Sequence, residues 1–574
     1  MARWRCLLVA LTVMVLVGCA AAAPNVGGEG ADRGSPDAPV RTLNLLTRAE
    51  PATLAAKAPR GAGGESPGVS VDSAVRPFNA GLDILDARGD PRPYLAEAVP
   101  ELNSDSWRVL PDGRMETSYR LKPNLTWHDG APLTAEDFVF AWRLYTAPEF
   151  GLASLAPQSL MEAVIAPDAR SLTIRWRQIY PQASVLGEGL PPLPRHILDP
   201  LLREEPEAFL GNAFWSSAYI GLGPYRLERW ERGAFFQGVA FEAHVWGRPK
   251  IQRIAVRFSS DENTALANLR AGTVHLASDR SIRFEQAVIL RTEWRTSEQG
   301  VTLLTPTMSR RTHVQVRPEY ATPRSLMDVR VRKALAYAVD KEALNEGLFS
   351  GLGVMTDTLI RPTVPYYAEI DRVVAKYPFD QRRSEQLMAE AGYVRGPDGT
   401  LANATGEAFR VQVQNQSGGQ PERETAIMMD TWKRAGFDTF PNILRPPASG
   451  DPELRAIFSG VQTASGGMGL EEMVNYVAGP EIPTQANRWR GSNRGGWSDP
   501  EFDRLYAIYN RTLDGGDRVR LLARMMAMVN EELPVIPLFM NFGVSAHLGS
   551  LVGPDPGAVD DTLLTWNIHE WELR

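Results

Sequence analysis

Two stretches of the sequence carry side chains that could bind a metal or move a proton. His128 lies in the tetrapeptide WHDG, and Glu471 and Glu472 are adjacent acids. A histidine can serve as a metal ligand or a base, and paired carboxylates can serve acid–base catalysis. However, Asp129 and Gly130 form a pair typical of tight turns, so we expect His128 to set the geometry of a turn. For the adjacent acids, a solvated loop is the commoner explanation.

Other signatures of catalysis are weak. The sequence contains no His-Glu-x-x-His motif and no Walker loop. Residues 221–226, GLGPYR, have the first two glycines of a dinucleotide loop, but Tyr225 and Arg226 follow where the third glycine would stand. We therefore expect a turn that leads into a strand. The seven histidines are scattered, so we predict neither a metal site nor a cofactor.

The two cysteines indicate where the protein resides. A positive start is followed by an apolar run of twelve residues, 6–17. A membrane-spanning helix needs about 20 residues, whereas this length is typical of a secretory signal peptide. The run ends in LVGC, which resembles a bacterial lipobox, where a lipoprotein signal peptidase cuts before an acylated cysteine. Cys19 would be that cysteine.

We therefore predict a signal peptide in residues 1–18, and an acylated Cys19 with a flexible Pro- and Gly-rich tether in residues 19–39. The alternative is an ordinary secretory signal cut after an alanine such as Ala22. In the lipoprotein case the mature protein has no free thiol, because Cys6 leaves with the signal and Cys19 is acylated. The expected location is the extracytoplasmic face of the cell membrane, or the periplasmic space if the cell has an outer membrane.

Composition limits the remaining possibilities. About 535 residues follow the tether, which is more than one hydrophobic core usually serves, so we expect two or three domains. The net charge of −7 argues against a nucleic-acid partner, which would require a basic surface. No later apolar run approaches membrane-spanning length.

Local patterns predict both strands and helices. In residues 114–122, RMETSYRLK, every second side chain belongs to one face, which predicts a half-buried strand. Residues 171–177 and 251–259 are further strand candidates. Helical patterns occupy residues 134–145, 261–272, 328–349, 380–393 and 498–509. The mixture predicts an α/β (mixed α+β) fold class without a single regular βαβ array.

Several of these stretches together resemble a known family. They are, in order, TLNLLTRAEPATL (42–54), SYRLKPNLTWHDGAPLTAEDFVFAWRL (118–144), GLGPYRLERWERG (221–233), DENTALANLRAGTVHLA (261–277), DVRVRKALAYAVDKEALNEGLF (328–349), GGWSDPEFDRLY (495–506) and ELPVIPLFMN (532–541). The set is similar to the extracellular solute-binding proteins of family 5, the dipeptide-, oligopeptide- and nickel-binding components of ABC importers. The resemblance spans almost everything after the tether.

The resemblance implies a two-lobed periplasmic-binding-protein fold (type II, cluster C) with an extra domain and a hinge. Domain I would be discontinuous, in residues 40–78, 216–305 and 535–574. Domain II would be residues 79–215, and domain III, the second lobe, residues 306–534. Two chain crossings, near 305 and 535, would form the hinge.

The same resemblance implies binding without turnover. Two lobes that close on a solute exclude water, which strengthens each polar contact inside. An extended peptide would be held by backbone hydrogen bonds, much like an added strand. We therefore predict a monomeric, non-enzymatic, lipid-anchored component of an ABC importer. It would capture an extended solute, with a peptide as the expected cargo, and deliver it to a membrane permease and its ATPase.

Two regions correspond to the ligand contacts of the family. The first follows the opening strand and comprises Arg48, Glu50 and Thr53. The second comprises Gly466, Gly467, Glu471, Glu472, Arg488, Trp489, Arg490 and Asn493. The glycines would let a ligand backbone approach, Trp489 would wall a side-chain pocket, and Arg488 or Arg490 would pair with a carboxylate. For the charged members, ordinary surface charge is the alternative.

The sequence departs from the peptide-binding relatives at one point. Those relatives carry an aspartate that pairs with the amino terminus of the ligand, whereas SGGMGLEE stands here. Glu471 or Glu472 would have to substitute; otherwise the cargo is not a simple peptide. The family also takes up oligosaccharides and opines, and nickel is disfavoured because histidines are few. A receptor without transport and a secreted hydrolase remain as alternatives.

Overall fold

The computed structural model describes residues 41–64, 71–153, 155–466 and 470–574. The predicted signal peptide, Cys19 and the tether lie outside these residues. Residues 41–574 form one compact unit, and the division into three domains stays a prediction. Within the described part of the chain, every helix is too short or too polar to cross a bilayer.

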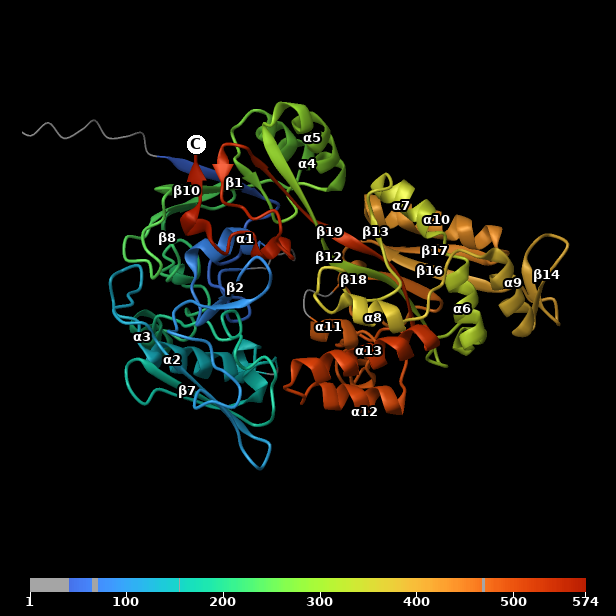
Figure 1. Cartoon of the computed structure of the whole chain (residues 1–574), viewed down its shortest axis with the longest axis horizontal. Coiled ribbons are helices and arrows are strands. Elements are labelled where there is room, and N and C mark those ends of the chain that lie inside the picture. Colours follow the sequence, from blue (N-terminus) through green and yellow to red (C-terminus); the bar gives the residue numbers. More distant parts are fainter. Residues whose placement is uncertain (1–40, 65–70, 154, 467–469) are drawn as a thin grey trace, which may run out of the picture. The chain divides into compact units, whose positions relative to one another are not determined.

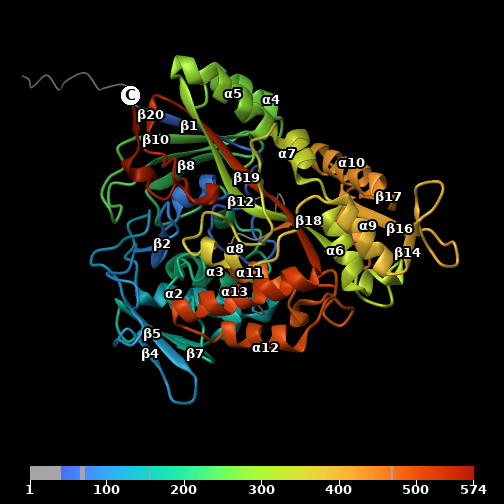
Figure 2. The same cartoon turned by 45° about the vertical axis from the view of Figure 1, so that its right-hand side comes forward.

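Two long antiparallel strands, β12 (Gly300–Val314) and β19 (Val535–Leu548), lie at the centre of the main sheet. Their pairing runs from Gly300 opposite Leu548 to His313 opposite Val535, with two irregularities. In both Figures 1 and 2 the two strands run side by side between the two halves of the sheet. The sheet is therefore continuous across the two chain segments that were predicted to form the crossings.

The other strands of the sheet flank this central pair. On one side, the order from β19 is β11 (Leu276–Ala277), β1 (Thr42–Thr47), β10 (Arg253–Phe258), β9 (Phe235–Ala240) and β8 (Tyr225–Glu231). On the other side, the order from β12 is β18 (Val461–Gly466), β16 (Arg410–Gln416) and β17 (Asp438–Leu444), while β13 (Val354–Met355) pairs with β19. Opening strand β1 is parallel to β10 and β11.

Helices cover the sheet on each side of the crossing. Helices α4 (Glu262–Arg270) and α5 (Phe284–Ser297) pack against β11, β12 and β19 around Leu46, Leu269 and Trp294. The remaining helices of the second half are α6 (Val329–Tyr337), α7 (Lys341–Phe349), α8 (Tyr367–Val373), α9 (Gln381–Glu390), α10 (Gly419–Arg434), α11 (Leu470–Asn475), α12 (Pro500–Tyr509) and α13 (Gly515–Glu532). Two apolar clusters, one around Trp432 and one around Phe502, bury these helices.

A separate four-stranded sheet packs beside the first half. Its strands, in order, are β4 (Trp107–Val109), β5 (Met115–Arg120), β7 (Ser171–Trp176) and β6 (Met161–Ile165), with helices α2 (Ala135–Thr146) and α3 (Arg195–Glu204) beside it. Short hairpins are β2 (Asp83–Leu85) with β3 (Pro91–Pro93) and β14 (Tyr393–Arg395) with β15 (Leu401–Asn403). Near the C-terminus, β20 (Leu551–Val552) pairs with β21 (Glu572–Leu573).

Most predicted elements are confirmed, with one difference. The strand predicted in residues 114–122 is β5, whose alternate side chains are buried. Residues 328–349, predicted as one helix, instead form α6 and α7, and Asp340 caps the second of them through the backbone N–H of Ala343 (2.9 Å). The apolar stripe continues through the break, so periodicity alone could not reveal it.

His128 has the structural role predicted for it. The backbone N–H of Gly221 donates to its Nδ1 (3.2 Å), and its Nε2 lies 3.0 Å from the carbonyl oxygen of Gly223. Burial lowers the pKa of His128 to about 4, so the ring is neutral at pH 7. The histidine therefore joins the WHDG turn to the GLGPYR turn, which leads into β8 as predicted.

A buried ion pair joins four elements of the second half. The guanidinium of Arg310 on β12 binds the carboxylate of Glu424 on α10, and both side chains are almost fully buried. The same guanidinium donates to Asn415 of β16 and to Ser465 of β18, each at 3.0 Å. The Arg310 guanidinium thus depends on α10, β16 and β18 for its acceptors.

We predict that Glu424→Gln strongly destabilises the protein. The change leaves the Arg310 charge buried without a counter-ion, which should lower the free energy of unfolding by roughly 3–5 kcal/mol in urea titrations. Asp430→Asn is the matched control, because Asp430 lies on the same helix in an exposed pair with Arg434. The Asp430→Asn change should lower the free energy of unfolding by less than about 1 kcal/mol. Equal losses in the two variants would contradict the assignment.

Candidate functional site

A cavity of about 260 Å³ lies beside the start of the short hairpin β2–β3. Residues 72–85, which carry α1 (Asp72–Val75), a 3-10 turn and β2, form one wall, and loop 185–189 forms another. We call this cavity the hairpin cavity. Its walls come from two segments about a hundred residues apart in the sequence.

Two glycines allow these segments to approach. A Cβ atom on Gly81 would lie 2.4 Å from the carbonyl oxygen of Gly187, and one on Gly187 would lie 2.1 Å from that of Asp83. Both distances are shorter than any contact that a side chain tolerates, so the backbones meet only because both residues lack a Cβ. The cavity wall therefore depends on glycine at both positions.

The most deeply buried charged group of the hairpin cavity is Asp83, which is only 3% exposed. Its Oδ2 accepts a hydrogen bond from the backbone N–H of Leu186 (2.7 Å). Burial raises the pKa of Asp83 to about 7; the loop N–H groups oppose this shift, and the nearby charge of Glu188 adds to it. Asp83 therefore changes its charge near neutral pH.

An ion pair lies in the same cavity. Arg76 Nη2 donates to Glu188 Oε1 at 2.9 Å, with side chains 13% and 78% exposed. The Nε atom of Arg76 is buried and, within the described part of the chain, has no hydrogen-bond partner. A buried N–H without an acceptor is costly, so an acceptor placed next to this atom would stabilise the structure.

Contacts link the hairpin cavity to the central strands. The carboxylate of Asp279 accepts from the backbone N–H groups of Ser73 and Ala74 in α1, each at 3.2 Å. The next residue, Arg280, places its Nη2 3.3 Å from the sulfur of Met308 on β12. Asp279 and Arg280 both have left-handed backbones, with φ of 48° and 60°. Such strain in consecutive non-glycine residues persists only where surrounding contacts impose it.

The first predicted group, Arg48, Glu50 and Thr53, lies in the loop after β1 and is engaged within the protein. Arg48 Nη1 donates to Glu262 Oε1 (2.9 Å). Glu50 accepts from Trp230 Nε1 (2.7 Å) and from a backbone N–H in the β8–β9 turn. Thr53 accepts from the backbone N–H of Ala55 (3.1 Å). Each side chain therefore stabilises the loop, and its contact with a ligand stays a prediction.

The second predicted group surrounds the end of β18. Gly466 pairs with Ser309 of β12, and a Cβ on it would lie 2.1 Å from the hydroxyl of Tyr476. Gly467 lies outside the described residues, as do the side chains of Glu471 and Glu472, whose backbone belongs to α11. Glycine at Gly466 thus serves the packing of Tyr476 against β18.

Loop 484–493 holds the remaining predicted residues. Arg488 and Trp489 have left-handed backbones, with φ of 57° and 58°. Trp489 is half-buried, and Arg488 and Arg490 are exposed. Asn493 is 1% exposed, and its Nδ2 donates to the carbonyl oxygens of Ala478 (3.0 Å) and Trp497 (2.7 Å). The amide of Asn493 therefore holds the loop in its shape.

The hydrogen bonds and ion pairs of the described residues do not join the two predicted groups. Two neighbouring residues of β12 come nearest to joining them. Met308 contacts Arg280 in the loop after β11, and Ser309 pairs with Gly466 of β18. Sequence reasoning missed this connection and the hairpin cavity. One local signal could have indicated the cavity: Asp83 is an acid inside the apolar run GLDIL.

A cluster on β12 was also missed. The guanidinium carbon of Arg311 lies 3.0 Å from the ring centre of Tyr476, and its Nε lies 3.3 Å from His313 Nε2. Arg311 and His313 are each 1% exposed. Burial, together with the charge of Arg311, holds the pKa of His313 well below its usual value. A neutral histidine can accept this hydrogen bond, so the cluster orders the sheet beside Gly466.

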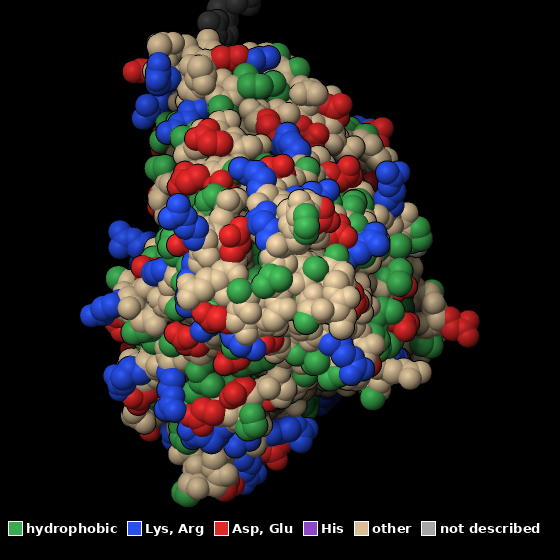
Figure 3. Space-filling model, turned by 90° about the vertical axis from the view of Figure 1, so that its right-hand side faces the viewer, with side chains coloured by type: hydrophobic (Ala, Val, Ile, Leu, Met, Phe, Trp, Pro, Cys, Tyr) green, Lys and Arg blue, Asp and Glu red, His purple; other side chains and the backbone are tan. Residues whose placement is uncertain are grey.

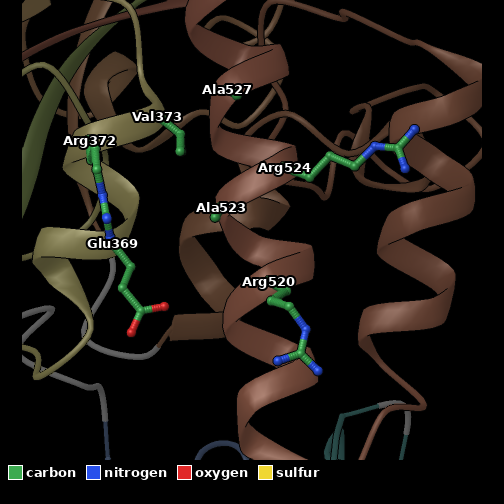
Figure 4. Close-up of a pocket in the computed structure, with 7 residues that line it drawn as sticks. All are labelled: Glu369, Arg372, Val373, Arg520, Ala523, Arg524 and Ala527. Carbon is green, nitrogen blue, oxygen red and sulfur yellow. The ribbon is translucent and has the colours of Figure 1, made fainter.

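A second depression, of about 520 Å³, lies between α8 and α13 (Figure 4). Figure 4 shows Glu369 and Arg372 on α8, and Arg520 and Arg524 on α13. The side chains of Arg520 and Arg524 are 72% and 60% exposed and pair with acids on the surface. On the face in Figure 3, basic and acidic side chains are interspersed. The charged side chains of the depression between α8 and α13 are thus ordinary surface charges. The hairpin cavity differs because its lining includes a buried carboxylate, that of Asp83.

The described residues contain no group of three or more His, Cys, Asp or Glu side chains placed to bind a metal ion.

Comparison with known proteins identifies the family. Residues 97–464 match the model of the bacterial extracellular solute-binding proteins, family 5 Middle. Among curated proteins, the chain is 23% identical over 353 residues to the oligopeptide-binding protein AppA of Bacillus subtilis, covering 60% of this chain and 59% of AppA. It is 25% identical over 348 residues to the glutathione-binding protein GsiB of Salmonella typhimurium, covering 59% and 63%. The chain spans less than two thirds of the length of these relatives.

Solved structures share the fold over nearly the whole chain. An oligopeptide binding protein from Thermus thermophilus, complexed with a pentapeptide, superposes with a TM-score of 0.71 at 22% identity, covering 93% of this chain and 96% of that one. NikZ of Campylobacter jejuni, in complex with Ni(L-His), superposes with a TM-score of 0.70 at 20% identity, covering 93% and 100%. The predicted fold class is confirmed. Since the family model matches more than half of its residues, the chain belongs to the bacterial extracellular solute-binding proteins of family 5.

Proposed function

We propose that this protein is the substrate-binding component of an ABC importer. It captures an extended solute, with a peptide as the expected cargo, and delivers it to a membrane permease without chemical turnover. The observation that carries this proposal is the family match across residues 97–464, together with the shared fold over 93% of the chain.

Named relatives support a peptide as the cargo. AppA and GsiB are named for oligopeptide and glutathione binding, and the solved AppA of Bacillus subtilis is in complex with a nonapeptide. Nickel binding has a precedent in NikZ. A peptide presents the mixture of carbonyl acceptors, N–H donors and charged ends that the polar groups of the hairpin cavity and loop 484–493 would match.

The strained loops also support a binding role. Consecutive left-handed residues occur at Asp279–Arg280, next to the central strands, and at Arg488–Trp489, in the predicted ligand loop. Strained backbone tends to occur at ligand sites, because a preorganised loop loses less freedom when it binds. Loop 484–493 would then contribute Trp489 as an apolar wall.

Purified protein should carry or accept a solute. We expect mass spectrometry of denatured protein to reveal a released peptide, and re-addition of that peptide to raise the melting temperature, because a ligand that binds only the folded state stabilises it. The peptide should be recovered intact after long incubation. Appearance of cleavage products would favour a hydrolase, and absence of any bound or stabilising solute would contradict the proposal.

Changes at the predicted contacts should separate binding from folding. Trp489→Ala and Glu471→Ala should each weaken affinity for the released peptide about tenfold and shift the melting temperature by less than about 2 °C. Asn493→Ala is the structural comparison: it removes buried hydrogen bonds to Ala478 and Trp497 and should lower the melting temperature markedly. If all three variants lose affinity and stability together, the contact assignment is wrong.

We further propose that Cys19 is acylated and anchors the protein to the extracytoplasmic face of the cell membrane. An acyl chain contributes about 0.8 kcal/mol per buried methylene group to membrane binding, so its loss should release the protein. Cys19→Ser should therefore appear in the soluble fraction, whereas Cys6→Ser, in the predicted signal peptide, should stay with membranes. Detergent-dependent partitioning of Cys19→Ser would disprove the anchor.

A further inference from the structure

We propose that the hairpin cavity is a subsite for a cationic group of the cargo, with Asp83 as its counter-ion. The cationic group would be a lysine or arginine side chain, or a terminal ammonium. This inference rests on the proposed function, since it names a charge that the captured solute should carry.

The charge of the cavity favours a cation. Three carboxylates, of Asp72, Asp83 and Glu188, and one guanidinium, of Arg76, belong to its lining. Arg76 and Glu188 neutralise each other through their 2.9 Å ion pair. None of the ion pairs among the described residues includes Asp83, and a buried carboxylate is most stable next to an opposite charge.

The shape of the cavity suits a long basic side chain. Apolar walls come from Val75, Ile84 and Val185. Among the lining residues, Glu188 has a side chain that is 78% exposed, whereas Asp83 is only 3% exposed. A lysine side chain has an apolar stem and a charged tip, so its stem would contact the walls and its ammonium group would reach Asp83.

Arg76 provides a second polar group that could bind the cargo. The Nε of Arg76 is buried and, as far as the described residues go, donates to no acceptor. Because Arg76 already uses Nη2 for Glu188, a carbonyl oxygen of the cargo would complete its hydrogen bonds. A solute that brings both a cation and a carbonyl group, as a peptide does, would therefore satisfy both groups of the cavity.

Binding of a cation should be coupled to the ionisation of Asp83. Burial raises the pKa of Asp83 to about 7, and a bound cation would favour the ionised form. The cavity also contains or adjoins Glu188, Arg76, Asp72, Tyr94 and Tyr119, and burial raises the pKa values of both tyrosines far above neutral. Lys57 donates its Nζ to the carbonyl oxygen of the lining residue Gly189 (3.0 Å), and burial lowers the pKa of Lys57 to about 8, so it stays largely cationic near pH 7. Below about pH 7 a proton must leave as the cation binds, so affinity should rise with pH through this range.

The test compares charged and neutral probes by calorimetry. The probes are the tripeptide Ala-Lys-Ala, its analogue with neutral norleucine in place of lysine, and the N-acetylated form of each. We expect the wild type at about pH 8 to bind peptides with the preferred cation about tenfold more tightly than peptides without it, and this preference should shrink at about pH 6. If the preference follows lysine, the cation is a side chain; if acetylation abolishes it, the cation is the terminal ammonium.

Asp83→Asn should remove the preference and its pH dependence, while an asparagine oxygen still accepts the N–H of Leu186. Asp86→Asn is the matched control: Asp86 is buried after the same strand but pairs with Arg92 instead of lining the cavity. It should retain the wild-type preference. Should Asp83→Asn fail to fold, the pH dependence of the wild type toward lysine and norleucine peptides still decides the question.

Two results would overturn the inference. The first is equal binding of charged and neutral peptides by the wild type, which would leave the proposed function intact. The second is a preference that persists unchanged in Asp83→Asn. Failure of all four tripeptides to bind, with no peptide among the released cargo, would instead refute peptide binding itself and the inference with it.

Discussion

The structure depends on the antiparallel pairing of β12 and β19. These two strands hydrogen-bond along most of their length, from Gly300 to His313, and carry the backbone ladder from one half of the main sheet to the other. Because each strand belongs to both halves, side chains near the middle of β12 can contact elements of either half. Met308 contacts the loop after β11, while Arg310, two residues later, binds Glu424 of α10.

Buried charge accumulates on the second half of β12. Arg310 and Arg311 are almost fully buried, one in an ion pair with Glu424 and the other against Tyr476 and His313. Hydrophobic residues of similar volume often stabilise a core equally well, so stability alone does not account for these buried charges. Their arrangement orders the end of β18, where Gly466 and the predicted ligand segment begin.

The first half also contains a buried acidic group, in the hairpin cavity. Its carboxylate, Asp83, is buried next to a loop that two glycines allow to come close, and α1 beside it is capped by Asp279 from the strained loop after β11. A polar group held in low dielectric interacts strongly with an opposite charge, provided that water is excluded. In the proposed subsite, Asp83 would use this interaction to distinguish cationic from neutral cargo.

Local patterns in the sequence are enough to predict the fold class and most elements, because strand alternation and helix capping depend on about ten neighbouring residues, as in residues 114–122 and 134–145. The ordered motifs also indicated the family. The burial of Asn493 and the contact of Arg311 with Tyr476 arise only when the whole chain folds. The tertiary structure alone brings Asp83 next to Leu186. These features join residues up to about 165 positions apart, and burial and pairing at that distance leave no periodic pattern in the chain.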